Sequence, residues 1–280
     1  YVVDDDNILK GRLSLKKMIL SPTSTKIQSI YNPDVTYVTT DEPAESVGRI
    51  MQKYDLVAIP VVDSIGRLVG RITIDDVVDV IREEAEKDYQ MMSGISQDVE
   101  SSDTIWDQTK ARLPWLIIGL FGGMLAAYMI SFYEADIALF PATAMFIPVI
   151  TAMGGNVGIQ SSAIVVKGLA SNTLTSKNIL QSISKEISCA VINACICSSI
   201  IFILSLCFNL TSLAMPITVT ISLFIVIMFA SMFGTAFPLL LNKLKIDPAL
   251  ATGPFITLTN DIIGLNIYLF TGKAILGWLL

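Results

Sequence analysis

Five long apolar segments occupy the chain from residue 113 to its end, and they constrain the fold more than any other feature. Each is close to or longer than the roughly 20 residues that an α-helix needs to cross a bilayer. The segments run over residues 113–132, 137–166, 187–210, 216–241 and 254–280. The second is long enough to tilt or break, since it contains Pro141 and Pro148. The sequence therefore predicts an α-helical membrane protein with five transmembrane helices.

Charge is concentrated before these segments. Residues 1–112 hold 20 of the 25 carboxylates and 13 of the 19 lysines and arginines, which gives this region a net charge of −7. Lysines also occupy alternate connections between the spans, at Lys167, Lys177, Lys185, Lys243 and Lys245. By the positive-inside rule, the N-terminal region and both lysine-bearing connections face the cytoplasm, and the C-terminus faces outside.

The N-terminal region alternates helical and strand patterns. Residues 43–54 have apolar positions at helical spacing, residues 56–63 and 68–74 read as two strands joined by a tight turn, and residues 75–92 read as a helix. Residues 1–32 begin with a strand, a turn and a second strand. An α/β domain is predicted here.

The stretches AIPVVD and GRLVGRIT, followed by an acidic helix start, resemble a CBS domain. The resemblance implies a CBS unit over residues 33–90, the remnant of a preceding unit over residues 1–32, a connecting helix or linker over residues 91–112, and a transmembrane domain over residues 113–280. The chain begins without Met or a signal peptide, so we expect a fragment of a longer protein.

CBS domains commonly bind adenine nucleotides, so the resemblance also implies a site for ATP. Thr73 and Asp76 match the ribose-contacting pattern. The competing interpretation, which we favour, is that Thr73 ends the strand and Asp76 caps the following helix.

Asp261 is the residue of the last apolar segment that needs an explanation. It lies seven residues after Pro254, which is roughly 10 Å along a helix. A carboxylate at that depth costs roughly 2.5–3.5 kcal/mol. It either serves a cation or makes packing hydrogen bonds with Thr259 or Asn260. A lysine partner is not at a suitable depth, because Lys273 lies about 18 Å further along the helix.

The second apolar segment contains the stretch PVITAMGGNVGIQSSA, in which Gly154, Gly155 and Gly158 remove side chains and Asn156 and Gln160 add amides. One interpretation is an unwound helix whose carbonyls line a cavity, since irregular backbone at membrane depth is tolerated only there or inside protein. The other is close helix packing through small residues, with the amides bonding between helices.

This glycine stretch, DPALATGP before the last span, and TLTNDIIG within it together resemble the MgtE family of magnesium channels and transporters, as does the order of a CBS region followed by five spans. The resemblance implies a homodimer with a pore at the subunit interface, bordered by the second and fifth spans. Asp261 matches the aspartate that recognises hydrated Mg²⁺, and Gly155, Asn156 and Thr257 match groups that contact its water shell. Mg²⁺ keeps much of its water and is held through one or two carboxylates, which agrees with this assignment.

Two positions depart from the family pattern. Ile159 stands where a second Asn is expected, and Ala163 stands where a hydroxyl residue is expected. The carboxylate site is unaffected, but selectivity for Mg²⁺ over Mn²⁺ or Co²⁺ stays open.

The predicted helix over residues 75–92 is crowded with carboxylates at spacings where like charges repel. A solvated helix face is the ordinary explanation. The MgtE resemblance implies instead that cytosolic Mg²⁺ binds here and favours a closed pore. The residues assigned to that regulatory site are Asp79, Glu83, Glu84, Glu86 and Asp88, with Asp247 of the membrane domain facing them.

The predicted function is a divalent cation channel or transporter in the inner or plasma membrane, gated by cytosolic Mg²⁺. Its expected partners are a second copy of the chain, the lipid bilayer and divalent cations, with no nucleic acid. The chain has no His and no recognisable nucleophile and base, so an enzyme is not expected. The alternatives are a carrier that couples divalent cation movement to Na⁺ or H⁺, and a receptor that senses cations or nucleotides without transport.

Overall fold

The computed structural model describes residues 1–171, 173–174, 178–207, 213–251 and 253–279. Two compact units divide the chain, Tyr1–Lys87 and Asp88–Leu280, and each is described by itself. Lys177 and the end of the predicted third span, residues 208–210, lie outside the described residues.

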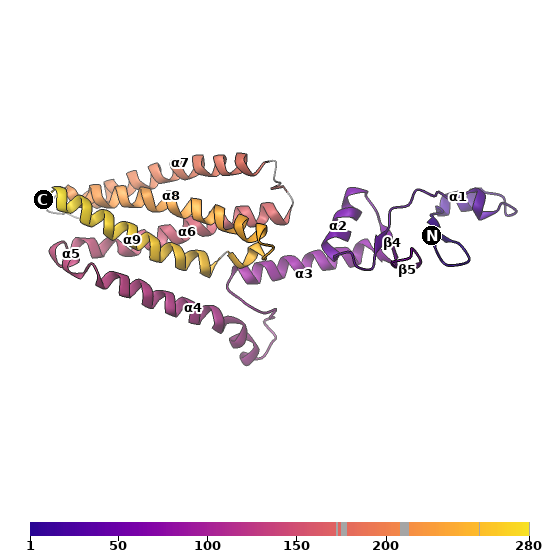
Figure 1. The fold of residues 1–280 in the computed structure, drawn as a ribbon, viewed down its shortest axis with the longest axis horizontal. Helices are drawn as coiled ribbons and strands as arrows, with labels where there is room; N and C mark the ends of the chain where they lie inside the picture. The colour runs from indigo at the N-terminus through magenta and orange to yellow at the C-terminus, as the bar shows by residue number, and fades with distance from the viewer. Residues whose placement is uncertain (172, 175–177, 208–212, 252, 280) are drawn as a thin grey trace. The chain divides into compact units, whose positions relative to one another are not determined.

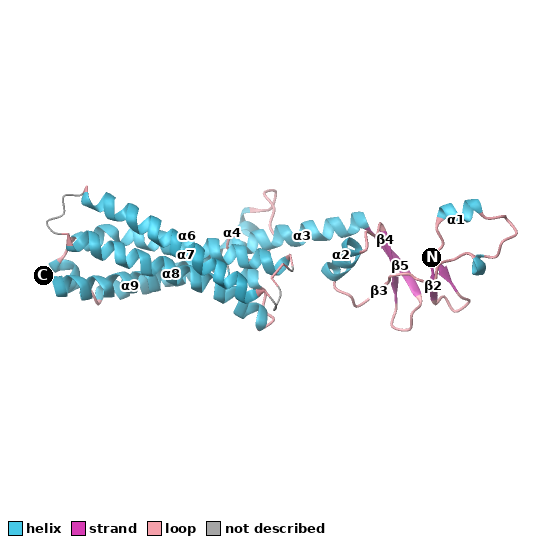
Figure 2. Ribbon diagram, turned by 90° about the horizontal axis from the view of Figure 1, so that it is seen from above, coloured by secondary structure: helices cyan, strands magenta, loops and turns pink. Residues whose placement is uncertain are grey.

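The first unit is an α/β structure, and every strand found in the described residues belongs to it (Figure 2). Its elements are β1 (Val2–Val3), β2 (Leu9–Gly11), α1 (Leu15–Leu20), η1 (Ile27–Ser29), β3 (Val38–Thr39), α2 (Ala44–Lys53), β4 (Ala58–Val62), β5 (Leu68–Thr73) and the start of α3 (Ile74–Met92). In its main sheet β4 lies between β3, to which it is parallel, and β5, to which it is antiparallel. The predicted strand pair and its flanking helices are therefore present.

A small apolar core joins this sheet to α2 and α3. Its buried members are Val38, Val47, Met51, Ile59 and Val77. They come from β3, α2, β4 and α3, so the core depends on all of these elements folding together. Most of the acidic residues of α3 are exposed.

Helices are the only regular secondary structure among the described residues of the second unit. It contains α4 (Ile105–Ser131), α5 (Glu134–Leu139), α6 (Ala142–Ala170), α7 (Ile179–Leu206), α8 (Ala214–Lys243), η2 (Pro248–Ala251) and α9 (Pro254–Leu279) (Figure 1). Four helices of the described chain are long and apolar enough to cross a membrane, namely α4, α6, α7 and α8. Helix α9 has 26 residues but carries Asn260, Asp261 and Lys273, and it is not among those four. The membrane class is confirmed, whereas the count of five spans stays a prediction.

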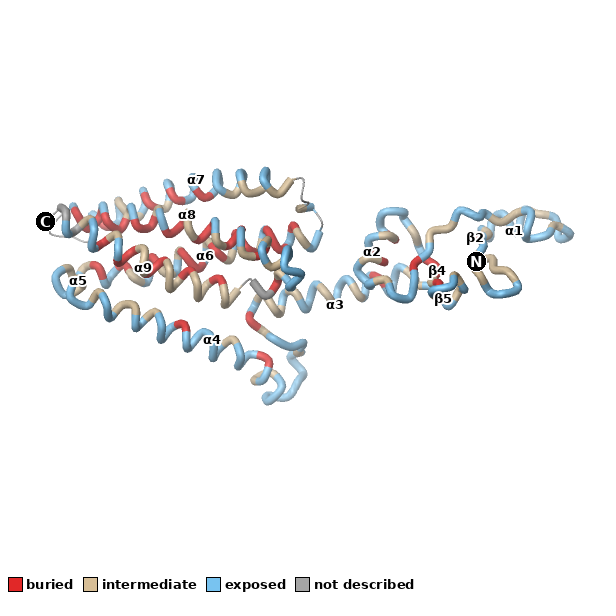
Figure 3. The backbone as a smooth tube through the Cα atoms, in the orientation of Figure 1, coloured by how far each residue is buried: buried red, intermediate tan, exposed pale blue. Residues whose placement is uncertain are grey.

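Helix α8 is the centre of this unit. It packs against α6, α7 and α9, and α6 also packs against α9. Buried positions follow α6, α8 and α9, while most of α4 is exposed (Figure 3). The main packing partner of α4 is α9. Its apolar surface is consequently left for lipid or another protein chain.

The second predicted span differs from the structure in two ways. The helix is interrupted at Phe140, which ends α5 with a φ of −129° and a ψ of 74°. Pro141 follows and directly precedes α6. The residue before a proline is disfavoured in the α conformation, which explains this boundary. Of the two interpretations of the glycine stretch, the unwound helix is wrong, because α6 is helical from Ala142 to Ala170.

Candidate functional site

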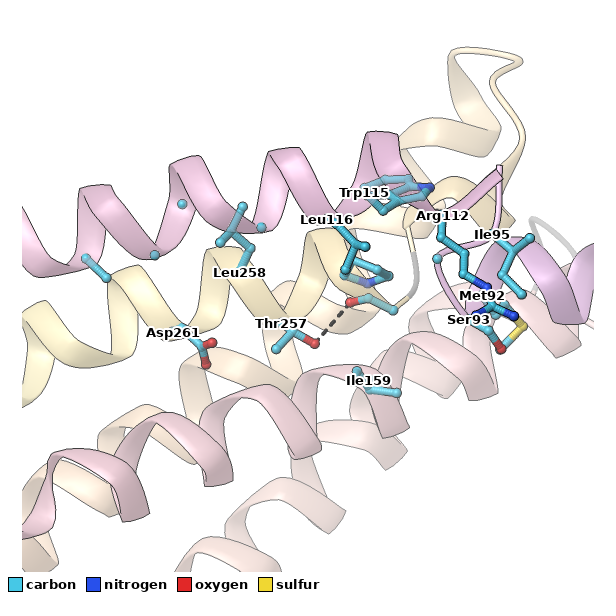
Figure 4. Close-up of a pocket in the computed structure, with 17 residues that line it drawn as sticks. Met92, Ser93, Ile95, Arg112, Trp115, Leu116, Ile159, Thr257, Leu258 and Asp261 are labelled. Atoms are coloured by element: carbon cyan, nitrogen blue, oxygen red, sulfur yellow. Dashed lines mark hydrogen bonds between the residues drawn. The ribbon is translucent and has the colours of Figure 1, made fainter. Parts of the chain in front are cut away.

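A cavity of about 790 Å³ lies in the second unit between α4, α6, α9 and the chain that follows α3. Its walls are mainly apolar, and Arg112 and Asp261 are its charged members. Arg112 lies near Met92 and Ser93 at one end of the cavity, whereas Asp261 lies further along α9 beyond Thr257 (Figure 4). An ionisable side chain that lines a cavity between such apolar helices is a candidate functional site.

Asp261 is half-buried, and within the described part of the chain no hydrogen bond or ion pair engages its carboxylate. The packing interpretation required a bond to Thr259 or Asn260, and neither bond is present. Lys273 instead pairs with Asp136, with 3.0 Å between Nζ and Oδ2. The acceptor capacity of Asp261 is therefore available to an ion or to water.

Gly155 brings α6 close to this carboxylate. A Cβ atom at residue 155 would lie 3.5 Å from Asp261 Oδ1 and 3.2 Å from Thr257 Cγ2. The structure thus brings together three of the residues selected from the sequence, Gly155, Thr257 and Asp261. Because α6 and α9 are regular helices here, the carbonyls of Gly155 and Thr257 already accept helical bonds and have only a second lone pair to offer.

Asn156 is placed differently. Its side chain and that of Gln160 are exposed, and neither residue lines the cavity. Ile159 lines the cavity from α6 instead. One face of α6 is therefore packed through glycines, and the neighbouring face presents amides that the described part of this chain does not cover.

Sequence reasoning missed two parts of this region. The first is the wall formed by α4, where Gly119, Gly122 and Gly123 line the cavity; their clustering in GLFGG was a usable signal. The second is Asn260, which is 1% exposed and whose amide atoms have no hydrogen-bond partner among the described residues. Its amide occupies the space that a Cβ at Gly158 would need, so Gly158 is required for this packing.

The acidic residues of α3 form no comparable site in one chain. Among the described residues no group of three or more acidic or metal-binding side chains is placed to hold an ion. Asp79, Glu83 and Glu86 are exposed, and Glu84 and Asp88 are partly buried. Glu86 pairs with Arg82 at 2.8 Å, and this hydrogen bond raises the pKa of the Arg82 guanidinium.

Asp247 has a local role in the structure. Its Oδ1 accepts a hydrogen bond of 2.9 Å from the backbone nitrogen of Ala249, at the start of η2. Its side chain is otherwise exposed. The regulatory assignment of Asp247 remains a prediction.

Thr73 and Asp76 bond to each other. Asp76 Oδ2 accepts from the Thr73 hydroxyl at 2.6 Å and from the Thr73 backbone nitrogen at 3.1 Å. These bonds lower the pKa of the Asp76 carboxyl. The cap differs in detail from our expectation, since Thr73 precedes the first residue of α3 and Asp76 is the third residue of that helix, as in a capping box.

A polar cavity of about 400 Å³ in the first unit lies elsewhere. It is lined by residues that include Arg12, Asp34, Thr36 and Tyr54, but by neither Thr73 nor Asp76. Thr73 and Asp76 therefore act on the helix start rather than on the walls of this cavity.

The fold and the site define a class of protein: an integral membrane protein with an α/β domain before its helices and a carboxylate inside a cavity between those helices. Comparison with known families gives the particular assignment. Residues 147–271 match the family model of MgtE, described as a divalent cation transporter, and residues 27–83 match the CBS domain. The chain is thus similar to the MgtE family over these residues, which agrees with the resemblance drawn from its motifs.

Named relatives agree. The magnesium transporter MgtE of Bacillus subtilis is 36% identical over 268 residues, which cover 96% of this chain and 59% of the relative. The magnesium transporter MgtE of Thermus thermophilus is 33% identical over 282 residues, which cover 99% of this chain and 61% of the relative. The chain thus spans about three-fifths of their length. Both are named as transporters rather than enzymes, as expected for this chain.

Two solved structures are similar to the first part of the chain. The cytosolic domain of the Mg²⁺ channel MgtE in complex with ATP is 51% identical, covers 29% of this chain and 32% of its own, and gives a TM-score of 0.28. The soluble part of a magnesium transporter is 40% identical, covers 30% of this chain and 33% of its own, and gives a TM-score of 0.30.

Proposed function

We propose that this chain forms a channel that conducts Mg²⁺ across the membrane, with Asp261 as the charge that recognises the ion. The observation that carries the proposal is an unpartnered carboxylate in a cavity of about 790 Å³ between α4, α6 and α9. The names of the relatives support the choice of ion.

The cavity favours a hydrated ion over a bare one. Mg²⁺ demands near-octahedral geometry and gives up water reluctantly, so it is commonly bound through one or two carboxylates with several waters. A single carboxylate in a roomy cavity suits that mode. Ile159 adds no polar contact to the water shell, so we propose that Mn²⁺ and Co²⁺ compete with Mg²⁺.

A homodimer is part of the proposal. Asn156 and Gln160 are exposed on a helix of the membrane unit, and an amide that faces lipid without a hydrogen bond is costly. A second copy, related by a two-fold axis, would cover this face and bring a second Asp261 toward the same ion path.

The proposed orientation places the N-terminus in the cytoplasm and the C-terminus outside. The ion pair of Lys273 with Asp136 joins α9 to α5, so these two elements lie at the same end of the helical unit, as this orientation requires. The proposed gate is binding of cytosolic Mg²⁺ by the acidic residues of α3. ATP binding through Thr73 and Asp76 is the weaker part of the proposal, since these two groups already satisfy each other.

The test is Mg²⁺ flux into liposomes that contain the purified protein with Asp261→Asn. This change keeps the size of the side chain and removes the charge, so we expect an intact fold and nearly complete loss of divalent flux. Glu134→Gln, an exposed acid at the start of α5, is the matched control and should conduct normally. Normal Mg²⁺ flux through folded Asp261→Asn protein would refute the proposal.

The second candidate is a carrier that exchanges a divalent cation for Na⁺ or H⁺. Asp261 would serve it equally well, since one carboxylate can bind each ion in turn. Single-channel currents at the level of many ions per opening would exclude the carrier.

A further inference from the structure

A second carboxylate lies inside the helical unit, away from the Asp261 cavity. Glu186 is the eighth residue of α7, roughly 10 Å from the start of that helix. Its Oε1 accepts a hydrogen bond of 2.6 Å from Ser161 Oγ on α6 and one of 2.8 Å from Ser231 Oγ on α8. The two hydroxyl oxygens are 3.2 Å apart. Three helices therefore place three oxygens around one point.

The two serines are deeply buried, at 3% exposure for Ser161 and 1% for Ser231. Each hydroxyl donates its one proton to the carboxylate of Glu186. Both hydroxyl protons are used in this way, which leaves the cluster with lone pairs and no further proton to donate. The cluster is thus an acceptor-rich site that carries one negative charge.

Basic residues do not compensate that charge in the described part of the chain. The basic side chains there on the three helices are Lys167 on α6, Lys185 on α7 and Lys243 on α8; all are exposed, and none forms an ion pair with Glu186. A charge taken out of water without a partner is costly. An ion from solution is therefore the natural counter-charge.

Solution can reach Glu186, though not the buried Ser161 and Ser231. Glu186 lines a separate cavity of about 270 Å³, whose other polar walls include Thr173, Ser182 and Thr235. A water molecule takes up about 30 Å³ of liquid, so this space holds several waters or a partly hydrated ion. None of these residues lines the cavity that contains Asp261.

The chemistry of the donors defines the ion. Carboxylate and hydroxyl oxygens suit hard cations rather than soft metals. The cavity beside Glu186 is much smaller than the one that contains Asp261, so it has less room for the water shell that Mg²⁺ keeps. Without that shell a divalent ion would leave a net positive charge beside one carboxylate, whereas a monovalent ion balances it. Oxygens within 3.2 Å of one another favour a small ion.

We propose that Glu186, Ser161 and Ser231 form a binding site for a small monovalent cation of the sodium class. The bound ion joins α6 to α7 and α8 through one oxygen from each helix. Ser161 is six residues from Gly155, or about 9 Å along α6. An ion bound at this site therefore contacts α6, the same helix whose Gly155 packs beside Asp261.

The experiment measures thermal unfolding of the purified full chain in detergent, with NaCl replaced stepwise by choline chloride at constant ionic strength. A ligand that binds only the folded state raises the unfolding temperature with its concentration. We expect Na⁺ to raise the Tm of the native protein and of Asp261→Asn, and to leave Glu186→Gln unchanged. Gln keeps an acceptor for both serines but lacks the charge, so this variant should fold.

Ser161→Ala keeps the carboxylate and removes one ligand. It should need about tenfold more Na⁺ for the same shift, the factor that corresponds to one lost hydrogen-bonding group near a charge. This variant carries the test if Glu186→Gln does not fold.

Three results would overturn the proposal: an equal Na⁺ response in native protein and Glu186→Gln, an equal response to K⁺ and Na⁺, or a response to pH with none to Na⁺. The readout does not involve Mg²⁺ flux. A failure here is consequently separate from a failure of the channel proposal, which rests on Asp261.

Discussion

The carboxylates of α3 and the carboxylate of Asp261 show how differently the same chemical group can act in two regions of one chain. Helix α3 carries seven carboxylates between Asp75 and Asp88, and most are exposed. Helix α9 carries Asp261 alone, half-buried beside apolar walls. Two unit charges 4 Å apart interact by about 1 kcal/mol in water and by several-fold more near or inside protein. On α3 each charge is screened by solvent, and several carboxylates together make up for that screening. On α9 the less polar surroundings strengthen the interaction of one carboxylate with an ion.

The packing around the carboxylates also differs between the two regions. The exposed side of α3 makes its contacts with solvent, so its charges can be changed without repacking anything. Asp261 is held where α9 packs against the glycines of α6, and Gly158 in turn packs against Gly234 of α8. The membrane site is thus sensitive to volume as well as to charge.

The largest effect that would sharpen this contrast is expected from Gly234→Ala. The added Cβ would overlap the carbonyl oxygen of Gly158, a backbone atom that cannot move without shifting α6. Overpacking of this kind costs roughly 1–3 kcal/mol or more. We expect a lower unfolding temperature and a strongly reduced Mg²⁺ flux.

Gly119→Ala is the matched control, since a Cβ at that position meets nothing within 4 Å. It should unfold like the native protein. Equal unfolding temperatures for Gly234→Ala and Gly119→Ala would show that α6 and α8 are not packed as closely as described.

The next effect concerns α3. Neutralising one exposed residue, as in Glu83→Gln, should change neither flux nor its inhibition by Mg²⁺, because neighbouring charges remain. Neutralising the whole regulatory set, namely Asp79, Glu83, Glu84, Glu86 and Asp88, should remove the inhibition. The measurement is Mg²⁺ flux at low and millimolar cytosolic-side Mg²⁺, together with protease cleavage near residues 79–100.

Loss of inhibition from Glu83→Gln alone would contradict the proposed difference between the two regions, because a single carboxylate of α3 would then be indispensable, as Asp261 is expected to be. Retained inhibition after all five changes would remove the regulatory site from α3.

The smallest effect is expected from Lys273→Met. Lys273 and Asp136 have 61% and 31% of their side chains exposed. Ion pairs with such exposure contribute roughly 0.2–1 kcal/mol. A double-mutant cycle with Asp136→Asn, followed by thermal unfolding, should give a coupling in that range and little change in flux. A coupling free energy several times larger would show that solvent does not weaken this exposed ion pair, so that charges at this end of the bundle interact as strongly as is expected of the half-buried Asp261.

The sequence alone determined the class of the molecule. Length and hydropathy of the apolar segments are local properties, so they predicted the helices of the membrane unit, and the alternating strand pattern predicted β4 and β5. Asp261 stood out for the same reason: a charge inside an apolar run is visible without knowing its neighbours. Pro141 was visible too, although its effect, a break before α6, was left open until the backbone was known.

The tertiary structure decided which side chains meet. Gly155 faces Asp261 while Asn156, one residue later, is exposed, because each step along a helix turns the side chain by about 100° and only packing fixes which side faces inward. The meeting of Glu186 with Ser161 and Ser231 joins residues that are 25 and 45 positions apart. No local pattern records such a distance, since it depends on how three helices rotate and pack against one another.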